Sequence, residues 1–275
     1  MSEVLIKRKE CLNIMNRNTT RKLWFATGLL LALTASSVSI VAQSPAPAQT
    51  HKSTTVRKAH NKAASGRAVT QTKQKQAALT PAQAFAMLRA GNQRFANGKM
   101  LHRNLLKQVK ETADGQYPFA TIVSCLDSRT SSELIFDQGI GDIFNARIAG
   151  NIVNEDIIGS LEFATKVAGS KVIAIVGHSN CGAVKGAIDD VKLGHLTGLL
   201  DKIKPAIDEG GDIHGARSSK NHELVEKVSE VNVKRMIQEL KEKSPLLKEM
   251  IDKGEVLLVG GMYDLHSGKV TFYQH

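Results

Sequence analysis

The chain has 275 residues, 42% of them hydrophobic, which is enough to bury one substantial core and allows one or two domains. Its net charge is +11, but residues 1–78 carry 13 Lys or Arg against 2 Asp or Glu, so this segment holds the whole surplus. Because the remaining residues balance in charge, the composition predicts no basic patch on the folded part and argues against a nucleic-acid partner.

Residues 1–43 have the pattern of an export signal. Six Lys or Arg precede an uncharged, mostly apolar run from Leu23 to Ala42. An uncleaved anchor is the alternative, since about 20 apolar residues can cross a bilayer. The small residues that follow the run favour cleavage near Ala42. The pattern therefore predicts an exported protein, periplasmic or extracellular, with no stable membrane span after cleavage.

Residues 44–78 are rich in Ala, Gln, Thr, Lys and Ser and contain almost no large apolar side chain. Such a segment cannot bury enough surface to offset its chain entropy, so we predict a disordered basic linker. A solvated spacer is favoured over a polybasic tether to anionic lipid. The folded domain is then predicted to span residues 79–275.

The first predicted element of that domain is an amphipathic helix that begins at Thr80 and Pro81, a cap residue followed by proline at the first helical position. Residues 119–125 form a short β-branched run, and residues 171–178 form a continuous apolar run that ends in Gly-His. Such runs are typical of strands buried on both faces of a parallel sheet.

Further strands and helices alternate along the rest of the chain. We expect a strand and turn at 143–153, a helix at 155–169, another helix after Cys181, two more within 222–252, and a closing strand and hairpin with its turn at Ser267 and Gly268. This alternation predicts βαβ units, and therefore an α/β fold with a central, mostly parallel sheet.

The cysteines give the first indication of chemistry. Of the three, Cys11 lies in the export signal, and an exported protein with two remaining cysteines ordinarily joins them in a disulfide. However, Cys125 follows one apolar run, and His178 ends the other, three residues before Cys181. Side chains at the carboxyl ends of neighbouring parallel strands converge. Two thiolates and one imidazole are typical of a catalytic zinc site.

Residues next to these cysteines fit the same hypothesis. Cys181 would lie near a helix N-terminus, which favours the thiolate, and Gly182 has no side chain to keep a small ligand from its backbone N–H. Asp127 and Arg129 follow Cys125 at intervals of two, and such a pair is ordinarily an exposed ion pair. Beside zinc, Arg129 would keep Asp127 ionised and away from the metal, so Asp127 is a conditional fourth ligand.

The two motifs, CLDSR at 125–129 and HSNC at 178–181, resemble those of the β-class carbonic anhydrases, and the likeness extends over about 79–275. The resemblance implies a zinc lyase with one Zn²⁺ per subunit that reversibly hydrates carbon dioxide to bicarbonate and a proton. It also implies about four parallel strands plus an edge strand, flanked by helices. The expected assembly is a homodimer or tetramer with the active site at the subunit boundary.

The resemblance assigns further site residues. Asp127 and Arg129 would be catalytic, orienting the nucleophile, while Gln116 and the Gly182 amide would hydrogen-bond the substrate. Phe144 and Phe163 match aromatic positions that line an apolar pocket.

A pH-closed subgroup of the family has tryptophan where this chain has Ile122. The difference predicts an open site near neutral pH, although Arg147 matches the arginine of that subgroup's regulatory pocket. Two alternatives stay open at the level of sequence. One is hydrolysis of carbonyl sulfide or carbon disulfide on the same fold, and the other is a metal-free, disulfide-linked exported binding protein.

Overall fold

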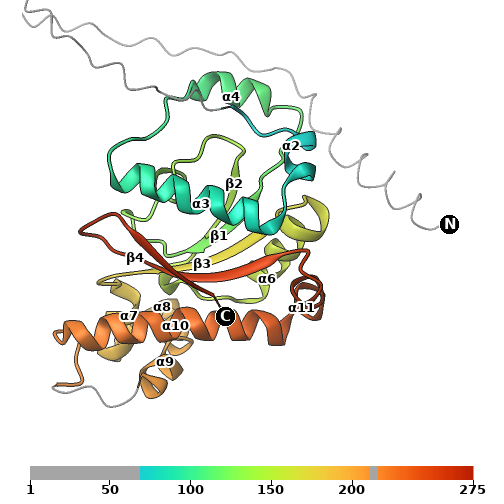
Figure 1. Ribbon diagram of the computed structural model, residues 1–275. Helices are drawn as coiled ribbons and strands as arrows, with labels where there is room; N and C mark the ends of the chain where they lie inside the picture. The colour runs from blue at the N-terminus through green and yellow to red at the C-terminus, as the bar shows by residue number, and fades with distance from the viewer. Residues whose placement is uncertain (1–68, 211–215, 275) are drawn as a thin grey trace, which may run out of the picture. The chain divides into compact units, whose positions relative to one another are not determined.

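The computed structural model describes residues 69–210 and 216–274, which form a five-stranded sheet flanked by helices (Figure 1). The strand order is β2-β1-β3-β4-β5; the first four strands are parallel, and β5 is antiparallel to β4. The strands are β1 (Ala120–Ser124), β2 (Ile143–Arg147), β3 (Val172–His178), β4 (Leu257–Tyr263) and β5 (Val270–Gln274). The predicted α/β fold with four parallel strands and one edge strand is confirmed.

Helices lie on both faces of the sheet, with α3 on one side and α10 on the other (Figure 1). Before β3 the helices are α2 (Lys73–Ala78), α3 (Pro81–Ala96), α4 (Leu105–Glu111), α5 (Ser132–Ile135), the 3₁₀ turn η1 (Ala149–Asn151), α6 (Glu155–Glu162) and the π-helical turn η2 (Phe163–Val167). After β3 they are α7 (Gly182–Ile188), α8 (Gly194–Asp201), α9 (Lys204–Glu209), α10 (His222–Lys243) and α11 (Pro245–Asp252). Within the described ranges, none of these helices is long and apolar enough to span a bilayer.

The two central strands are buried on both faces, as their continuous apolar runs predict. In β1, Ile122 packs into the core beneath α3, whereas the next residue, Val123, packs into the core that contains α10. In β3, Ala174 and Ile175 divide between the same two cores. Because successive side chains of a strand point to opposite faces, a strand between two helical layers is mostly apolar, and a buried polar side chain in it needs a partner, as Thr121 has in Ser170 at 3.0 Å.

Helix α3 begins where the sequence predicts. The Thr80 hydroxyl accepts a hydrogen bond from the Gln83 amide, and the Gln83 side chain accepts one from the Thr80 amide, which completes a capping box. Phe85 and Leu88 are buried against the sheet. A cap of this kind contributes about 1 kcal/mol to helix stability.

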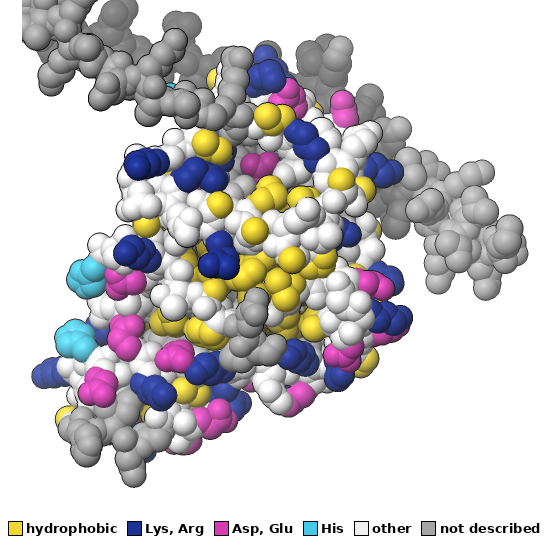
Figure 2. Space-filling view, in the orientation of Figure 1, with side chains coloured by type: hydrophobic (Ala, Val, Ile, Leu, Met, Phe, Trp, Pro, Cys, Tyr) yellow, Lys and Arg dark blue, Asp and Glu magenta, His cyan; other side chains and the backbone are white. Residues whose placement is uncertain are grey.

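Hydrophobic side chains also gather on the face between α3 and α10 (Figure 2). A cavity of about 660 Å³ opens there, lined by Pro81 and Phe85 from α3 together with Ile251 and Leu258. An apolar surface of this kind is typical of a site that a partner of similar character buries.

The folded part begins earlier than the predicted boundary at residue 79. Thr72 caps α2 by accepting a hydrogen bond from the Lys75 amide, and the buried Gln76 amide donates to the carbonyls of Pro118 at 2.7 Å and Ala168 at 2.8 Å. The prediction of a disordered linker is therefore wrong for residues 69–78. Residues 1–68, with the predicted export signal and most of the linker, lie outside the described residues.

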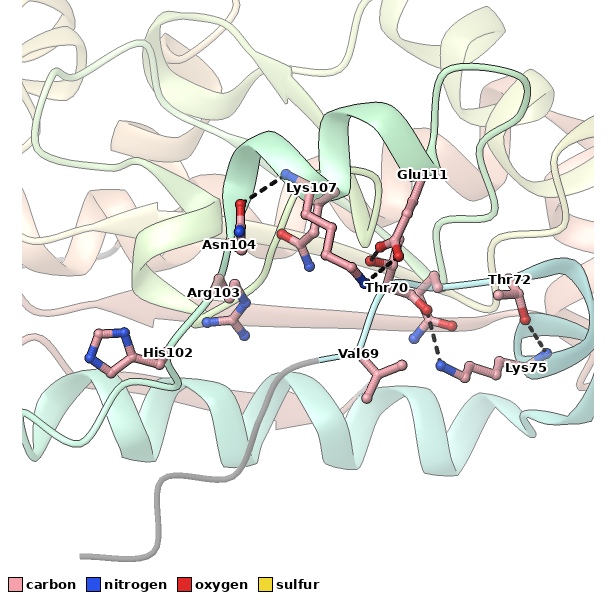
Figure 3. A pocket seen from close by; sticks show the side chains of 11 residues that line it. Val69, Thr70, Thr72, Lys75, His102, Arg103, Asn104, Lys107 and Glu111 are labelled. Atoms are coloured by element: carbon pink, nitrogen blue, oxygen red, sulfur yellow. Dashed lines mark hydrogen bonds and ion pairs between the residues drawn. The ribbon is translucent and has the colours of Figure 1, made fainter. Parts of the chain in front are cut away.

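The segment before α2 packs beside α4, around a cavity of about 780 Å³ (Figure 3). The Thr70 hydroxyl donates to Glu111 of α4 at 2.5 Å, and Lys75 Nζ donates to the Thr70 carbonyl at 3.0 Å. Polar contacts that are distant in sequence, rather than an apolar run, thus hold this part of the chain to the domain.

A buried ion cluster ties α3 to the loop after α5. Asp137 is completely buried, and its carboxylate accepts hydrogen bonds from Arg94 Nε at 2.5 Å, from Arg103 Nη1 and from the Leu101 amide. Removing one partner from a buried charged cluster costs much more than the net stabilisation of the intact cluster, because the other charges lose their compensation.

We therefore expect Asp137→Asn to lower the free energy of unfolding by about 3 kcal/mol. Asparagine tolerates the positive φ of 45° at this position, so the variant tests charge rather than backbone strain. Urea unfolding followed by circular dichroism measures the effect. The control is Asp252→Asn, which disrupts an exposed ion pair with Lys248 and should change stability by less than about 0.5 kcal/mol. Equal changes in the two variants would contradict the prediction.

Candidate metal centre

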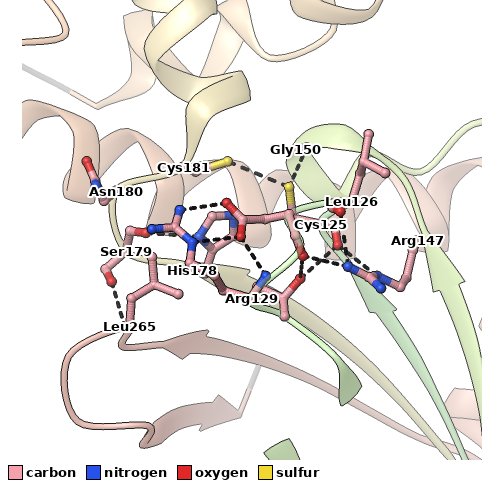
Figure 4. Close-up of polar contacts among 12 residues, drawn as sticks. Cys125, Leu126, Arg129, Arg147, Gly150, His178, Ser179, Asn180, Cys181 and Leu265 are labelled. Carbon is pink, nitrogen blue, oxygen red and sulfur yellow. Dashed lines mark hydrogen bonds and ion pairs between the residues drawn. The ribbon is translucent and has the colours of Figure 1, made fainter. Parts of the chain in front are cut away.

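The predicted metal ligands meet at the carboxyl ends of two neighbouring strands (Figure 4). Cys125 directly follows β1, His178 is the last residue of β3, and Cys181 is the N-cap residue of α7. Because β1 and β3 pair in parallel, their ends bring these side chains together. The three ligand atoms lie within 4.8 Å of one another, and each residue is at most 4% exposed.

The two sulfurs are placed for a shared metal rather than for a disulfide. Their separation is 4.0 Å, and both cysteines are free thiols. A disulfide bond is about 2.0 Å long. Tetrahedral zinc with Zn–S bonds of about 2.3 Å places two sulfurs about 3.8 Å apart. The geometry therefore fits zinc and disfavours the disulfide alternative.

The imidazole is oriented to offer one nitrogen to this site. His178 Nδ1 lies 2.9 Å from the Ser179 carbonyl oxygen, which can only accept, so the proton is assigned to Nδ1. Nε2 then carries the lone pair; it is buried and has no hydrogen-bond partner among the described residues. A metal-binding histidine is typically held in this way by a carbonyl at its other nitrogen.

The protonation of the thiols also favours a cation. A hydrogen bond from Cys181 lowers the pKa of Cys125, and hydrogen bonds from the backbone of Asp127 and Gly150 lower it further. The ionised Cys125 and burial in turn raise the pKa of Cys181. Two adjacent buried thiolates repel each other, and a divalent ion between them offsets that repulsion.

Asp127 is held by Arg129 at the rim of the site. Arg129 donates from Nε to Oδ1 at 2.9 Å, from Nη2 to Oδ2 at 2.7 Å and from its backbone amide to Oδ1 at 2.9 Å. These hydrogen bonds hold the pKa of the Asp127 carboxyl well below its usual range. Oδ2 lies 4.0 Å from His178 Nε2, so the carboxylate is near the three ligands while its oxygens are engaged by Arg129. This arrangement agrees with a conditional role for Asp127 as a ligand.

Arg147, at the end of β2, braces the same loop. Its guanidinium donates to the carbonyls of Cys125 at 3.2 Å, Leu126 at 3.0 Å and Asp127 at 2.5 Å. The family resemblance connects this arginine only with the regulatory pocket of the pH-closed subgroup. In the structure it positions the loop that carries the first metal ligand.

Gly182 and Gln116 lie at opposite ends of the sheet. Gly182, the first residue of α7, is exposed beside Cys181, with open space where a side chain would be. Gln116 is exposed and precedes the amino end of β1, whereas Cys125 follows its carboxyl end. Five strand residues span about 17 Å. Within one subunit, Gln116 is therefore not brought to the metal ligands.

Phe144 and Phe163 pack together, with ring centroids 6.4 Å apart, and line a cavity of about 580 Å³ with Thr121. Thr121 and Phe144 are register partners near the amino ends of β1 and β2. None of the three metal ligands lines this cavity. Within one subunit, the predicted aromatic pocket and the metal centre are therefore separate.

Comparison with known sequences gives a consistent result. The sequence profile of a family described as carbonic anhydrase matches residues 120–270. Carbonic anhydrase 2 of Mycobacterium tuberculosis is 31% identical over 201 residues, which cover 71% of this chain and 94% of that protein. A carbonic anhydrase of Mycolicibacterium smegmatis is 29% identical over the same shares of the two chains.

Solved structures agree with this result. One of two tetrameric β-carbonic anhydrases from Sordaria macrospora superposes with a TM-score of 0.54 at 26% identity, over 68% of this chain and 95% of its own. The Coccomyxa β-carbonic anhydrase in complex with acetazolamide gives a TM-score of 0.53 at 26% identity, over 59% and 74%. Together with the buried Cys125, His178 and Cys181, these matches show that the chain belongs to the carbonic anhydrase family, and within it to the β class.

Proposed function

We propose that this enzyme reversibly hydrates carbon dioxide to bicarbonate and a proton with one Zn²⁺ per subunit, held by Cys125, His178 and Cys181. The observation that carries the proposal is the convergence of two thiols and one imidazole on a single buried point in a carbonic anhydrase fold. When bound there, zinc supplies Lewis acidity that makes water available as a nucleophile near neutral pH.

Asp127 orients the attacking water. Arg129 keeps the Asp127 carboxylate ionised, so this carboxylate can accept a hydrogen bond from the O–H group of the nucleophile and aim a lone pair at the carbon atom of carbon dioxide. Because both carboxylate oxygens already accept from Arg129, we propose that the site is open near neutral pH, with Asp127 away from the metal. The Gly182 amide donates to the substrate oxygen on which charge develops.

The remaining site residues come from a second copy of the chain. Gln116, Phe144 and Phe163 gather near the amino ends of β1 and β2, away from the metal ligands of their own subunit. The edge position of β2 and the 50% exposure of Phe163 leave this region accessible to another subunit. In a homodimer or tetramer, Gln116 of one subunit would donate to the substrate at the metal of the other, and the two phenylalanines would supply apolar lining.

The tetrameric relative from Sordaria macrospora supports an oligomer. The apolar face between α3 and α10 gives this chain a further surface that a second copy can bury (Figure 2). Sedimentation velocity of the zinc-loaded protein tests the proposal, and a monomer at the concentrations used for activity assays would contradict it.

We also propose that the enzyme acts after export, in the periplasm or outside the cell, with residues 1–43 removed. The support is the basic segment followed by the apolar run from Leu23 to Ala42. Mass spectrometry of the protein isolated from its host tests cleavage. A mature chain that still begins at Met1 would contradict it.

Stopped-flow measurement of carbon dioxide hydration by the zinc-loaded enzyme tests the catalytic proposal. Carbonyl sulfide and carbon disulfide are assayed beside it, because the same nucleophile can attack all three linear molecules. We expect carbon dioxide to be the preferred substrate and Asp127→Ala to lower its hydration rate by about 100-fold. Preference for a sulfur-containing substrate, or full activity of the Asp127 variant, would overturn the assignment.

A further inference from the structure

Two side chains of α10 reach the backbone turns that carry the metal ligands. Asn232 Nδ2 donates to the Gly150 carbonyl at 2.8 Å, and the Gly150 amide donates to Cys125 Sγ at 3.4 Å. Six residues earlier on the helix, Glu226 Oε1 accepts from the Asn180 amide at 2.7 Å. One helix thus holds a turn beside the first cysteine and the turn between His178 and Cys181.

The turn at Gly150 has little freedom to compensate for a lost contact. Gly150 has a φ of 68°, and a Cβ atom there would lie 2.5 Å from Ile203 Cδ1, so any other residue would be strained at this position. Asn232 of α10 is completely buried, and its hydrogen bond to the Gly150 carbonyl holds this carbonyl toward the helix. The N–H that points at the Cys125 sulfur belongs to the preceding peptide group and is joined to this carbonyl through the Gly150 Cα.

The second turn is also in an uncommon conformation. Asn180 has a φ of 57°, in the left-handed region that residues other than glycine seldom adopt. Its amide points at the half-buried Glu226 carboxylate, and this charge-assisted bond favours that conformation. His178 and Cys181 are three residues apart in the sequence, and the turn in this conformation brings their ligand atoms close together.

We propose that α10 is the outer support of the zinc site and that Asn232 and Glu226 are positioning residues for it. Asn232 fixes the Gly150 carbonyl and through it the backbone of this residue, whose N–H, in the preceding peptide group, bonds to the Cys125 sulfur and directs its lone pairs. Glu226 fixes the turn that presents His178 and Cys181. The inference rests on the proposed zinc function, and outer contacts of this kind typically change metal affinity by 10–100-fold.

Asn232→Ala with Ser229→Ala as its control tests the first contact. Ser229 is buried on the same helix, but its hydroxyl donates only to the Val225 carbonyl, at 2.7 Å, within the helix. Zinc affinity is measured by competition with a chromophoric chelator, and the sulfur environment by the thiolate-to-metal absorption band of the Co²⁺-loaded protein. We expect Asn232→Ala to weaken zinc binding by about 10–100-fold and to shift the band to longer wavelength. Ser229→Ala should change neither.

Glu226 supplies an independent pair of variants at a half-buried position, where a substitution disturbs less packing than at the completely buried Asn232. Glu226→Gln keeps an oxygen that can accept from the Asn180 amide, whereas Glu226→Ala does not. We expect Glu226→Ala to weaken zinc binding by about 10-fold and Glu226→Gln to retain affinity close to wild type. This rescue separates hydrogen bonding from a general loss of packing, and it decides the proposal even if Asn232→Ala does not fold.

Different results would overturn the proposed zinc function and the proposed role of α10. Wild-type protein that binds no zinc would overturn the proposed function, and this inference with it. Wild-type protein that binds zinc, while Asn232→Ala and Glu226→Ala keep wild-type affinity and an unshifted Co²⁺ band, would overturn the role of α10 alone.

Discussion

Replacing Cys181 with serine is expected to abolish both zinc binding and carbon dioxide hydration. The substitution removes one of three ligand atoms that lie within 4.8 Å of one another and leaves a hydroxyl, which remains protonated and is a poor zinc ligand. The loss in zinc affinity should exceed the roughly 100-fold effect of an outer contact. Zinc content after dialysis, determined by atomic absorption, and stopped-flow hydration measure the two losses.

An activity-independent measurement shows whether the variant has lost the ligand or the fold. Zinc stabilises the native state because it binds there preferentially, so the thermal midpoint of the wild type should fall when a chelator is added. Cys181→Ser should fold but show no such difference. As a control, Ala187→Ser adds a hydroxyl at a buried position of the same helix and should keep its zinc response. A Cys181→Ser protein that retains zinc and full activity would contradict the ligand assignment.

The parts of the fold that sequence predicted correctly are those that local physics decides. β1 and β3 lie between two helical layers, so their side chains are buried and mostly apolar, and the runs at 119–125 and 171–178 predict this directly. The start of α3 is encoded by Thr80, Pro81 and Gln83, which lie within four residues. The metal ligands were predictable for the same reason, since each follows or ends such a strand.

Elements held by distant contacts were not predictable in this way. Helix α2 has the sequence KQKQAA, with no apolar face, and it is fixed by the Gln76 amide on carbonyls 42 and 92 residues away. The charges around Asp137 belong to residues 34 and 43 positions earlier in the chain. Nothing in the local sequence distinguishes these residues from solvent-exposed ones.

The residues of α10 that support the metal ligands could not be predicted from sequence for a related reason. Asn232 and Glu226 are unremarkable polar residues of a long helix, and their importance comes from a peptide and a turn that lie 82 and 46 residues away. The resemblance proposed Gln116, but the separation of Gln116 from Cys125 along β1 became apparent only in three dimensions. The structure thereby adds a point that the resemblance leaves open, namely which subunit supplies Gln116 to a given metal centre.

Co-expression of Gln116→Ala and Cys181→Ser chains is expected to restore activity that neither variant has alone. If the substrate lies between subunits, a mixed dimer has one site that combines the intact metal ligands of the Gln116 variant with the intact Gln116 of the Cys181 variant. Random pairing makes half of the dimers mixed, each with one complete site of two, so activity should reach about a quarter of wild type. Gln116→Ala alone should retain about 1%, as expected for the loss of one donor to developing charge.

The control is co-expression of Cys125→Ser with Cys181→Ser, in which no pairing produces a complete set of ligands in one subunit, so activity should stay at background. Hydration is measured by stopped flow on the zinc-loaded mixtures at equal subunit concentration. Recovery in the first mixture and not in the second can arise only if one chain completes the other's site. If the first mixture remains at the level of Gln116→Ala alone, Gln116 does not act across the boundary, and the pocket formed by Phe144 and Phe163 loses its proposed connection to the metal centre.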